Sequence, residues 1–325
     1  MQRILIVKTS SLGDVVHNLP VVTDMHRFFE PGELIVDWVV EEAYAELPAM
    51  HPGVSRVLPV ALRRWRTDWF GATVKAEREA FRQKVCEVAY DAVLDTQGLL
   101  KSALLARSAR LVDGGLRIGA NWRGAREPLA SLFYNRRMAV DAGLHAVERL
   151  RSLAASGLDY PVVGGPDFGL QVPQRTFDWL PHPAYAVMLH ATSRAEKSWP
   201  ADRWVTLGRR LAASNIVPVF VWGSPGEEVV ARELAAQISD AIVPPRMRLS
   251  ELAALLGGAR VVVGVDTGLT HLAAALGSRV VALFGATPRW RFAPYWNPIA
   301  VSLGDDGVQP GLAEVAASLQ GLGVL

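Results

Sequence analysis

The chain has 325 residues, of which 50% are hydrophobic and 20% charged, and this balance excludes an intrinsically disordered protein. Its length suggests two domains, each large enough to bury its own core. The formal net charge of +2 is too small to indicate nucleic-acid binding, although it leaves room for local basic patches.

The cysteine content and the first residues indicate where the protein works. Cys86 is the single cysteine, so an internal disulfide is impossible, and no cluster of cysteine and histidine indicates zinc. The first residues lack the long apolar core of a signal peptide, and no run approaches the 18 apolar residues of a membrane span. We therefore expect a soluble cytoplasmic protein that visits a membrane surface.

In the first half of the chain, short runs of β-branched residues alternate with helical patterns. Strands are predicted at residues 4–7, 34–40, 56–60 and 92–95, and helices at residues 15–29, 41–50, 69–89 and 99–109. Buried strands that alternate with helices are typical of parallel βα units.

A segment of different composition divides the chain. Between about residues 160 and 183 the sequence carries several prolines and glycines and no sustained periodicity, which is typical of a connection between domains. We place a first domain at residues 1–165, a linker at 166–184 and a second domain at 185–310. The remaining residues, 311–325, are expected to form a helix, with a return to the first domain as one option.

The second half repeats the alternation. Strands are predicted at residues 185–191, 216–222, 260–265 and 279–285, and helices at residues 202–214, 225–238, 249–257 and 270–277. The prediction is therefore an α/β protein of two Rossmann-like domains with parallel sheets that face each other across a cleft. Such a cleft is a common place for a ligand.

The motif GVDTGLTHLAAALG, residues 264–277, is a candidate anion site. It puts Asp266 at a strand end, Thr267 and Gly268 in the turn, and His271 in the first helical turn. The N–H groups of a helix N-terminus attract anions, and glycine lets a phosphate approach the backbone. The alternative is that Asp266 and Thr267 only cap the helix while His271 makes structural hydrogen bonds, and the residues alone support both about equally.

Two further strand ends carry polar residues. HATSRAEKSWP, residues 190–200, offers the hydroxyls of Thr192 and Ser193 and the mobile cation of Lys197, a set that suits a diphosphate. In WGSPGEE, residues 222–228, Glu227 suits ribose hydroxyls. The alternatives are a solvated surface lysine and a glutamate favoured by the helix dipole. No GxGxxG follows the first strand and no GxxxxGK[ST] is present, so dehydrogenases and P-loop nucleotidases are poorly supported.

Five motifs, in order over most of the chain, together resemble the lipopolysaccharide heptosyltransferases of glycosyltransferase family 9, in particular their type I members. They are KTSSLGDVVHNLP (8–20), DTQGLLKSALLAR (95–107), REPLASLFYNRR (126–137), HATSRAEKSWP (190–200) and VDTGLTHLAAALG (265–277). The resemblance implies the GT-B fold, with the donor held by the C-terminal domain and the acceptor by the N-terminal domain. It also implies an inverting transfer of L-glycero-D-manno-heptose from ADP-heptose to the inner Kdo sugar of Kdo-lipid A.

Matched position by position, the resemblance implies roles for individual residues. Glu227 would hold the ribose, Met247 would lie by the adenine, although a lone methionine is usually core packing, and Asp14 would be the general base, its alternative being a helix cap. No metal or other cofactor is expected to be obligatory, because Lys197 and a helix N-terminus would stabilise the leaving diphosphate. The implied donor site comprises Thr192, Ser193, Lys197, Glu227, Met247, Asp266, Thr267, Gly268 and His271.

The acceptor carries carboxylates and phosphates, so arginines of the first domain are candidates for binding it. ALRRWRTDWF, residues 61–70, interleaves arginines with Trp65 and Trp69, a pattern that suits a lipid–water interface. For any one arginine the alternative is a solvated charged surface. We expect peripheral contact with the cytoplasmic face of the inner membrane, and no nucleic-acid partner. The candidates are Arg63, Arg64, Arg66, Arg123, Arg126, Arg136 and Arg137.

Three other functions compete with this interpretation. A GT-B-like nucleotide-sugar epimerase would use the same cleft without a lipid acceptor, and the segment of arginines and tryptophans argues against it. A heptosyltransferase of the same family could act on a later core acceptor. A non-catalytic nucleotide-sugar sensor would not need the acid of Asp14.

Overall fold

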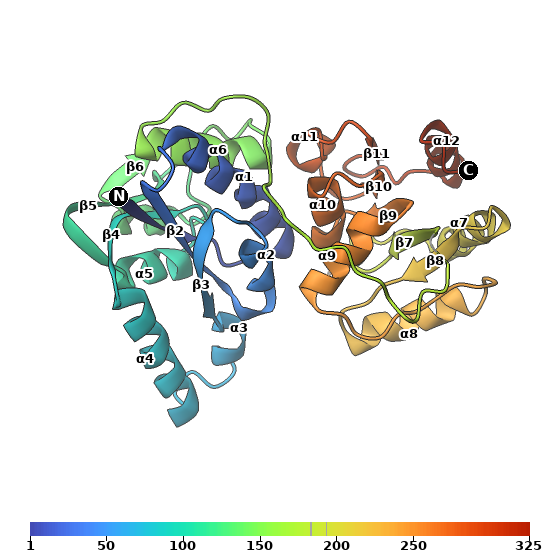
Figure 1. The fold of residues 1–325 in the computed structure, drawn as a ribbon, viewed down its shortest axis with the longest axis horizontal. Coiled ribbons are helices and arrows are strands. Elements are labelled where there is room, and N and C mark those ends of the chain that lie inside the picture. Colours follow the sequence, from blue (N-terminus) through green and yellow to red (C-terminus); the bar gives the residue numbers. More distant parts are fainter. Residues whose placement is uncertain (183, 193) are drawn as a thin grey trace. The chain divides into compact units, whose positions relative to one another are not determined.

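The computed structural model describes residues 1–182, 184–192 and 194–325, and it divides into two compact units, Met1–Gln171 and Val172–Leu325 (Figure 1). Each unit is built on one parallel sheet, which confirms the predicted α/β class with two parallel-sheet domains. The boundary between the units lies within residues 166–184, the segment that we assigned to the linker.

The first unit holds a six-stranded sheet in the order β3-β2-β1-β4-β5-β6. Its first strand pairs with β2 on one side and β4 on the other, so the strand order reverses between β1 and β4, where α/β proteins commonly bind ligands. The strands are β1 (Gln2–Val7), β2 (Leu34–Glu41), β3 (Val54–Val60), β4 (Ala89–Asp95), β5 (Arg110–Ala120) and β6 (Arg136–Met138). Sequence analysis missed β5 and β6, because β5 carries Asp113 and three glycines and β6 is three residues long.

Helices pack on this sheet and on each other. The predicted helix at residues 41–50 forms instead as two short pieces, and the predicted helix at 69–89 begins only after Gly71. The buried ion pair between Asp24 and Arg151 ties α1 to α6 at 2.8 Å. The helices are α1 (Leu12–Phe28), η1 (Glu42–Tyr44), α2 (Glu46–Ala49), α3 (Leu62–Trp65), α4 (Ala72–Cys86), α5 (Leu100–Ser108), η2 (Pro128–Phe133) and α6 (Ala146–Leu158).

The second unit holds a five-stranded parallel sheet in the order β11-β10-β9-β7-β8, and here the order reverses between β7 and β9. All five residues of β7 and of β9 are buried, which explains their continuous apolar runs. The strands are β7 (Tyr185–Leu189), β8 (Val217–Phe220), β9 (Val261–Val265), β10 (Val280–Leu283) and β11 (Ala300–Leu303).

The last helix of the chain belongs to the second unit. Val315 and Leu319 of α12 are fully buried in the same core cluster as Trp204 of α7, so the option that residues 311–325 return to the first domain was wrong. The helices of this unit are η3 (Ala195–Lys197), α7 (Ala201–Ala213), α8 (Pro225–Ala235), α9 (Leu249–Gly258), α10 (Gly268–Ala275), α11 (Arg289–Phe292) and α12 (Leu312–Gly321). Within the described residues, no helix of either unit has both the length and the apolar character to cross a bilayer.

Candidate active site

Asp14 lies in the first turn of α1, directly after the turn that follows β1. One carboxylate oxygen, Oδ2, accepts hydrogen bonds from the backbone N–H and the hydroxyl of Ser11, both at 3.2 Å. The other oxygen, Oδ1, accepts a hydrogen bond from Arg126 at 2.8 Å and lies 3.8 Å from the ammonium of Lys8. Asp14 therefore caps the helix with one oxygen and faces two cations with the other.

The electrostatic surroundings keep Asp14 ionised. Burial by itself would raise the pKa of this carboxyl, but the charges of Lys8 and Arg126 outweigh burial and hold its pKa well below the usual range. Lys8 is almost fully buried, and burial lowers the pKa of its ammonium although Asp14 opposes that shift. At neutral pH the Asp14 carboxylate is thus a ready but weak base.

The motif DTQG supplies a second buried acid, Asp95, at the end of β4. Its oxygens accept hydrogen bonds from the backbone N–H groups of Gln97 at 2.8 Å and Gly98 at 3.1 Å, and from the Tyr134 hydroxyl at 2.7 Å. Burial raises the pKa of Asp95, and these hydrogen bonds oppose the rise. The acid fixes the turn after β4 and lies in the core of the unit.

Gln97 joins the turn after β4 to the turn after β1. Its side-chain oxygen accepts from the backbone N–H groups of Thr9 at 3.0 Å and Ser10 at 3.2 Å. Its side-chain nitrogen donates to the carbonyl of Ser10 at 2.6 Å. The backbone that leads to Asp14 is therefore held in place by a neighbouring loop at the point where the strand order reverses.

A close backbone contact brings Arg126 to Asp14. Gly98 has a positive φ of 68°, and a Cβ there would lie 3.3 Å from the backbone nitrogen of Arg126. The carbonyl of Gly98 accepts from the N–H of Glu127 at 3.0 Å, and the Glu127 carboxylate accepts from the N–H of Leu100 at 2.6 Å. These contacts fix the loop that carries Arg126, 112 residues away from Asp14 in the chain.

Asp266 is the centre of a polar cluster in the second unit. It follows β9, and α10 begins at Gly268 with Thr267 as its N-cap residue. Oxygen Oδ2 accepts from the Lys197 ammonium and from the Thr287 hydroxyl, both at 2.6 Å. Oxygen Oδ1 lies 3.0 Å from Nε2 of His271.

This cluster is buried and charged. Burial would raise the pKa of Asp266, but the contacts of His271, Lys197 and Thr287 outweigh burial and hold its pKa well below the usual range. The Lys197 side chain is 16% exposed, so it is not a solvated surface lysine. An ammonium, an imidazole and the N-terminus of α10 together form a site that suits a diphosphate.

The other predicted donor residues follow neighbouring strands of the same sheet. Thr192 comes after β7 and is half-buried, and its hydroxyl oxygen accepts from the N–H of Arg194 at 3.5 Å. Glu227 follows β8 and closes a capping box with Ser224. Met247 is half-buried ahead of α9. The predicted Ser193 lies outside the described residues.

Because β7, β8 and β9 are parallel neighbours, the residues that follow them lie at one edge of the sheet. Thr192, Glu227 and Asp266 therefore share the carboxyl-end edge of this unit. One oxygen of Glu227 is already used by the backbone N–H groups of Gly223 at 2.8 Å and Ser224 at 3.1 Å, as the helix-cap alternative expects. The capping box therefore uses one carboxylate oxygen of Glu227, and the second oxygen is the one that suits a ribose hydroxyl.

Of the seven predicted acceptor arginines, Arg126 is the one that contacts Asp14. Arg64 forms ion pairs with Glu42 and Glu77, and Arg136 forms one with Asp159. The remaining four are exposed: Arg63, whose guanidinium lies 5.3 Å from the centre of the Tyr44 ring; Arg66; Arg123; and Arg137, which donates to the carbonyl of Tyr134 at 3.1 Å.

The expectation of a tryptophan interface in residues 61–70 was wrong for Trp65. Its ring is 4% exposed within a core cluster of the first unit, and its indole N–H donates to Glu77 at 2.6 Å. Trp69 is 40% exposed, and the guanidinium of Arg78 lies over its ring at 3.8 Å. The physical reason is that α3 turns one aromatic ring inward, which a linear sequence pattern does not reveal.

Sequence reasoning missed Lys8, Gln97 and Thr287 as site residues. Lys8 offered a weak signal, since a lysine that directly continues four buried apolar residues is rarely solvated. Thr287 offered none, because it lies 21 residues after Asp266 in a loop beyond β10.

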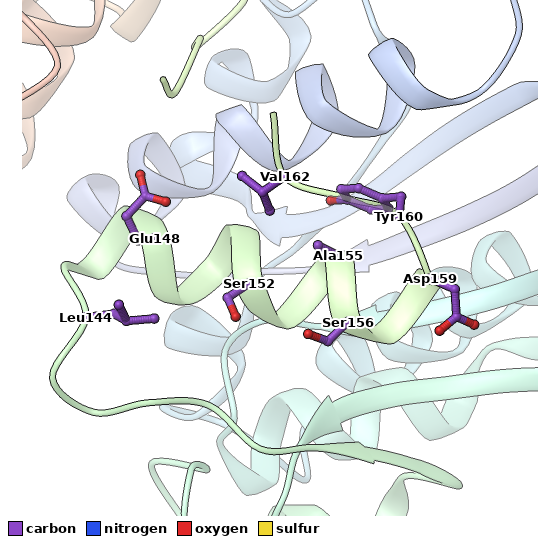
Figure 2. Close-up of a pocket in the computed structure, with 8 residues that line it drawn as sticks. All are labelled: Leu144, Glu148, Ser152, Ala155, Ser156, Asp159, Tyr160 and Val162. Carbon is purple, nitrogen blue, oxygen red and sulfur yellow. The ribbon is translucent and has the colours of Figure 1, made fainter. Parts of the chain in front are cut away.

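A surface groove of about 720 Å³ along α6 lies apart from these residues (Figure 2). Figure 2 shows the helix on one side and the segment of Tyr160 and Val162 on the other. Its lining contains none of the predicted site residues: Leu144, Glu148, Ser152, Ala155, Ser156, Asp159, Tyr160 and Val162.

Comparison with known proteins decides the family. The model for glycosyltransferase family 9 (heptosyltransferase) matches residues 78–317. Lipopolysaccharide heptosyltransferase 1 of Escherichia coli strain K12 is 48% identical over 289 residues, which cover 88% of this chain and 88% of that protein. The chain belongs to glycosyltransferase family 9.

Two solved structures extend this family 9 assignment to the fold. E. coli heptosyltransferase WaaC with ADP matches with a TM-score of 0.87 and 41% sequence identity, over 98% of this chain and 99% of that one. The same protein with ADP-2-deoxy-2-fluoro heptose matches with a TM-score of 0.83 and 42% identity, over 98% of both chains. The expected GT-B fold and the expected glycosyltransferase class are thereby confirmed.

Proposed function

We propose that this family 9 enzyme transfers L-glycero-D-manno-heptose from ADP-heptose to the inner Kdo sugar of Kdo-lipid A, with inversion at the anomeric carbon. The observation that carries the proposal is the 48% identity to a lipopolysaccharide heptosyltransferase 1 over 88% of the chain. The identity to a type 1 enzyme also favours the inner-core acceptor over a later one. ADP and a fluorinated ADP-heptose are bound by the similar E. coli WaaC, which supports ADP-heptose as the donor.

The donor is proposed to bind at the carboxyl-end edge of the second sheet. Lys197 and the N-terminus of α10 would face the diphosphate, and Asp266 would hold Lys197 and His271 in position. When the anomeric C–O bond breaks, the electron pair leaves with ADP, and these positive groups stabilise the charge that gathers on its phosphate. Thr192 and Ser193 would add hydroxyl donors, Thr267 and Gly268 would let the phosphate approach the backbone, and Glu227 and Met247 would hold the nucleoside.

Asp14 is proposed to act as the general base. The acceptor hydroxyl attacks the anomeric carbon, a new C–O bond forms, and the hydroxyl proton passes to the Asp14 carboxylate as ADP departs. The depressed pKa of Asp14 makes it a weak base in the free protein. Binding of an anionic acceptor would draw Arg126 away from Asp14 and exclude water, and both changes raise the pKa of Asp14.

The acceptor is proposed to be held by cations of the first unit, with Arg126 as the first candidate because it already contacts Asp14. Arg123 is exposed and only three residues away in the chain. No divalent metal is proposed as an obligatory cofactor, since Lys197 and α10 supply positive charge for the leaving group. The acceptor is a membrane lipid, so the enzyme is proposed to work as a peripheral protein on the cytoplasmic face of the inner membrane.

Release of ADP from ADP-heptose, measured with and without Kdo-lipid A, tests this function. We expect release only when both substrates are present, and equal rates with and without a chelator such as EDTA. Heptose rearrangement without acceptor would instead identify an epimerase, and tight donor binding with no turnover would identify a sensor. Turnover with an acceptor that already carries heptose, but not with Kdo-lipid A, would point to a later step. Loss of activity with EDTA would overturn the metal-independent mechanism alone.

A further inference from the structure

The outer face of α5 and η2 carries exposed leucines. The two helices pack together through Ala103 and Ala130, which are fully buried in one small cluster. Their outward side chains include Leu104, which is 56% exposed, and Leu129 and Leu132, which are 51% and 61% exposed. We call these three residues the leucine patch.

Helical spacing orders this surface. Residues three apart in a 3₁₀-helix lie on the same side, so Leu129 and Leu132 of η2 point in one direction. On α5, the exposed residues Lys101, Leu104 and Arg107 are also three apart and form one stripe. Leu104 therefore lies between two cations on the surface of the first unit.

Lys101 and Arg107 of α5, and Arg123 in the loop before η2, differ from the arginines that form ion pairs. Arg64 and Arg82, for example, form ion pairs with nearby glutamates. In the described part of the chain, by contrast, the ion pairs include none of the exposed side chains of Lys101, Arg107 and Arg123. Their charge is therefore available to an external anion.

We propose that the enzyme rests on a bilayer that contains anionic phospholipid through the leucine patch and Lys101 and Arg107 of α5, with Arg123 and the half-exposed Trp122 of the loop before η2. Lysine and arginine are attracted to anionic lipid head groups, tryptophan favours the membrane interface, and leucines insert among the acyl chains. A protein partner fits less well, since lysine is depleted in the cores of protein interfaces.

The position of the leucine patch suits the proposed reaction. This inference rests on the proposed function, in which the acceptor is a lipid. η2 begins two residues after Arg126, and Arg126 contacts Asp14 at 2.8 Å. A lipid whose acyl chains stay in the bilayer beneath the leucine patch would hold its sugar head group near Asp14. The sequence pattern placed the membrane interface at residues 61–70, where Trp65 is buried. We place it at the leucine patch instead.

Sedimentation of the full-length protein with vesicles tests the surface. Vesicles of phosphatidylcholine with phosphatidylglycerol are expected to bind the wild type, and phosphatidylcholine vesicles to bind it far less. The double variant Leu129→Ser, Leu132→Ser is expected to bind the anionic vesicles about tenfold more weakly. Lys101→Gln and Arg107→Gln are each expected to weaken binding about fivefold.

Matched control variants show whether weaker binding is specific to this surface or follows from any loss of exposed apolar area or positive charge. Val229 and Val230 of α8 are 56% and 43% exposed, so the double variant Val229→Ser, Val230→Ser removes similar apolar surface elsewhere. Arg82→Gln removes a cation that pairs with Glu79. Both controls are expected to bind anionic vesicles like the wild type, and circular dichroism checks that every variant is folded.

Activity with two acceptors distinguishes failure of this proposal from failure of the proposed function. The leucine double variant is expected to keep wild-type turnover of a Kdo acceptor without acyl chains and to lose turnover of Kdo-lipid A embedded in vesicles. Vesicle binding equal to that of the wild type, or equal loss on both acceptors, would overturn the docking surface. So would a wild type that binds anionic and neutral vesicles alike. A wild type that releases no ADP with either acceptor would refute the function, whatever the vesicles bind.

Discussion

Asp14 and Asp266 are the same residue type at equivalent places in two sheets, and they are held differently. Each follows a buried strand where the strand order reverses, each lies at the start of a helix, and each contacts a lysine. Burial opposes ionisation of both, yet neighbouring groups hold both pKa values well below the usual range. The difference lies in how their oxygens are satisfied.

Both oxygens of Asp266 are held by short contacts from Lys197, Thr287 and His271, and its side chain is 7% exposed. The Asp14 side chain is 18% exposed, its lysine lies at 3.8 Å, and its arginine is itself half-exposed. A fully satisfied carboxylate positions its partners, whereas a loosely held one can change partners and accept a proton. This difference supports the roles proposed above, with Asp266 as an anchor for its partners and Asp14 as the general base.

Asp14→Asn should give the largest effect. The amide keeps the shape of the cap but cannot accept a proton, so kcat is expected to fall about 10²- to 10⁴-fold while the Kd for ADP stays the same. Steady-state ADP release and calorimetric ADP titration measure the two quantities. Asp141→Asn, an exposed turn aspartate of the same unit, is the control. Near-normal turnover of a folded Asp14→Asn variant would remove the chemical role.

Asp266→Asn should weaken donor binding rather than chemistry. Lys197 and His271 lose the charge that orients them, so the Kd for ADP is expected to rise roughly tenfold or more, with a loss of about 2 kcal/mol of unfolding free energy. Because the folded-state pKa of Asp266 is depressed, this stability is present above about pH 4 and is lost as the pH falls further.

Denaturant unfolding of the Asp266→Asn variant at neutral and acid pH measures the second effect, with Asp306→Asn, an exposed aspartate of the same unit, as control. Unchanged ADP affinity together with reduced kcat would reverse the roles assigned to the two acids.

Arg126→Met tests the proposed role of Asp14 through the pH dependence of kcat/KM. Removing this cation lets the pKa of Asp14 rise toward its ordinary value, so protonation silences the base at a higher pH. The acid limb of the kcat/KM profile is expected to move to higher pH. At neutral pH kcat/KM is expected to fall about tenfold, because the proposed contact of Arg126 with the anionic acceptor is lost. Arg82→Met, which removes an exposed arginine of α4, should leave the profile unchanged. A profile that does not move would show that Arg126 does not set the pKa of Asp14.

Thr287→Val should give the smallest effect. It removes one of the two donors to Oδ2 of Asp266 and leaves Lys197 in place, so the KM for ADP-heptose is expected to rise about fivefold with kcat unchanged. Thr287→Ser keeps the hydroxyl and should restore the wild-type KM. A change in kcat alone, or no rescue by serine, would argue against a positioning role.

Local sequence patterns predicted the class of fold and the turns that carry Asp14, Lys197 and Asp266, because buried parallel strands and helix starts leave local signatures. They could not predict which distant residues meet. Arg126 reaches Asp14 across 112 positions and Lys197 reaches Asp266 across 69, and both encounters depend on loop paths. Local pattern also failed for Trp65, since the direction in which a short helix turns its rings is set by packing.

The Gln97 side chain, which bridges two loops, reduces the entropy that is lost when substrates bind. Its side chain satisfies backbone groups of Thr9 and Ser10, so the segment before Asp14 loses its conformational entropy when the polypeptide folds. When the substrates bind, the segment before Asp14 is already ordered, so no binding free energy is lost in ordering it. The free energy of substrate binding is then available for aligning the two sugars, because this part of the site is preorganised.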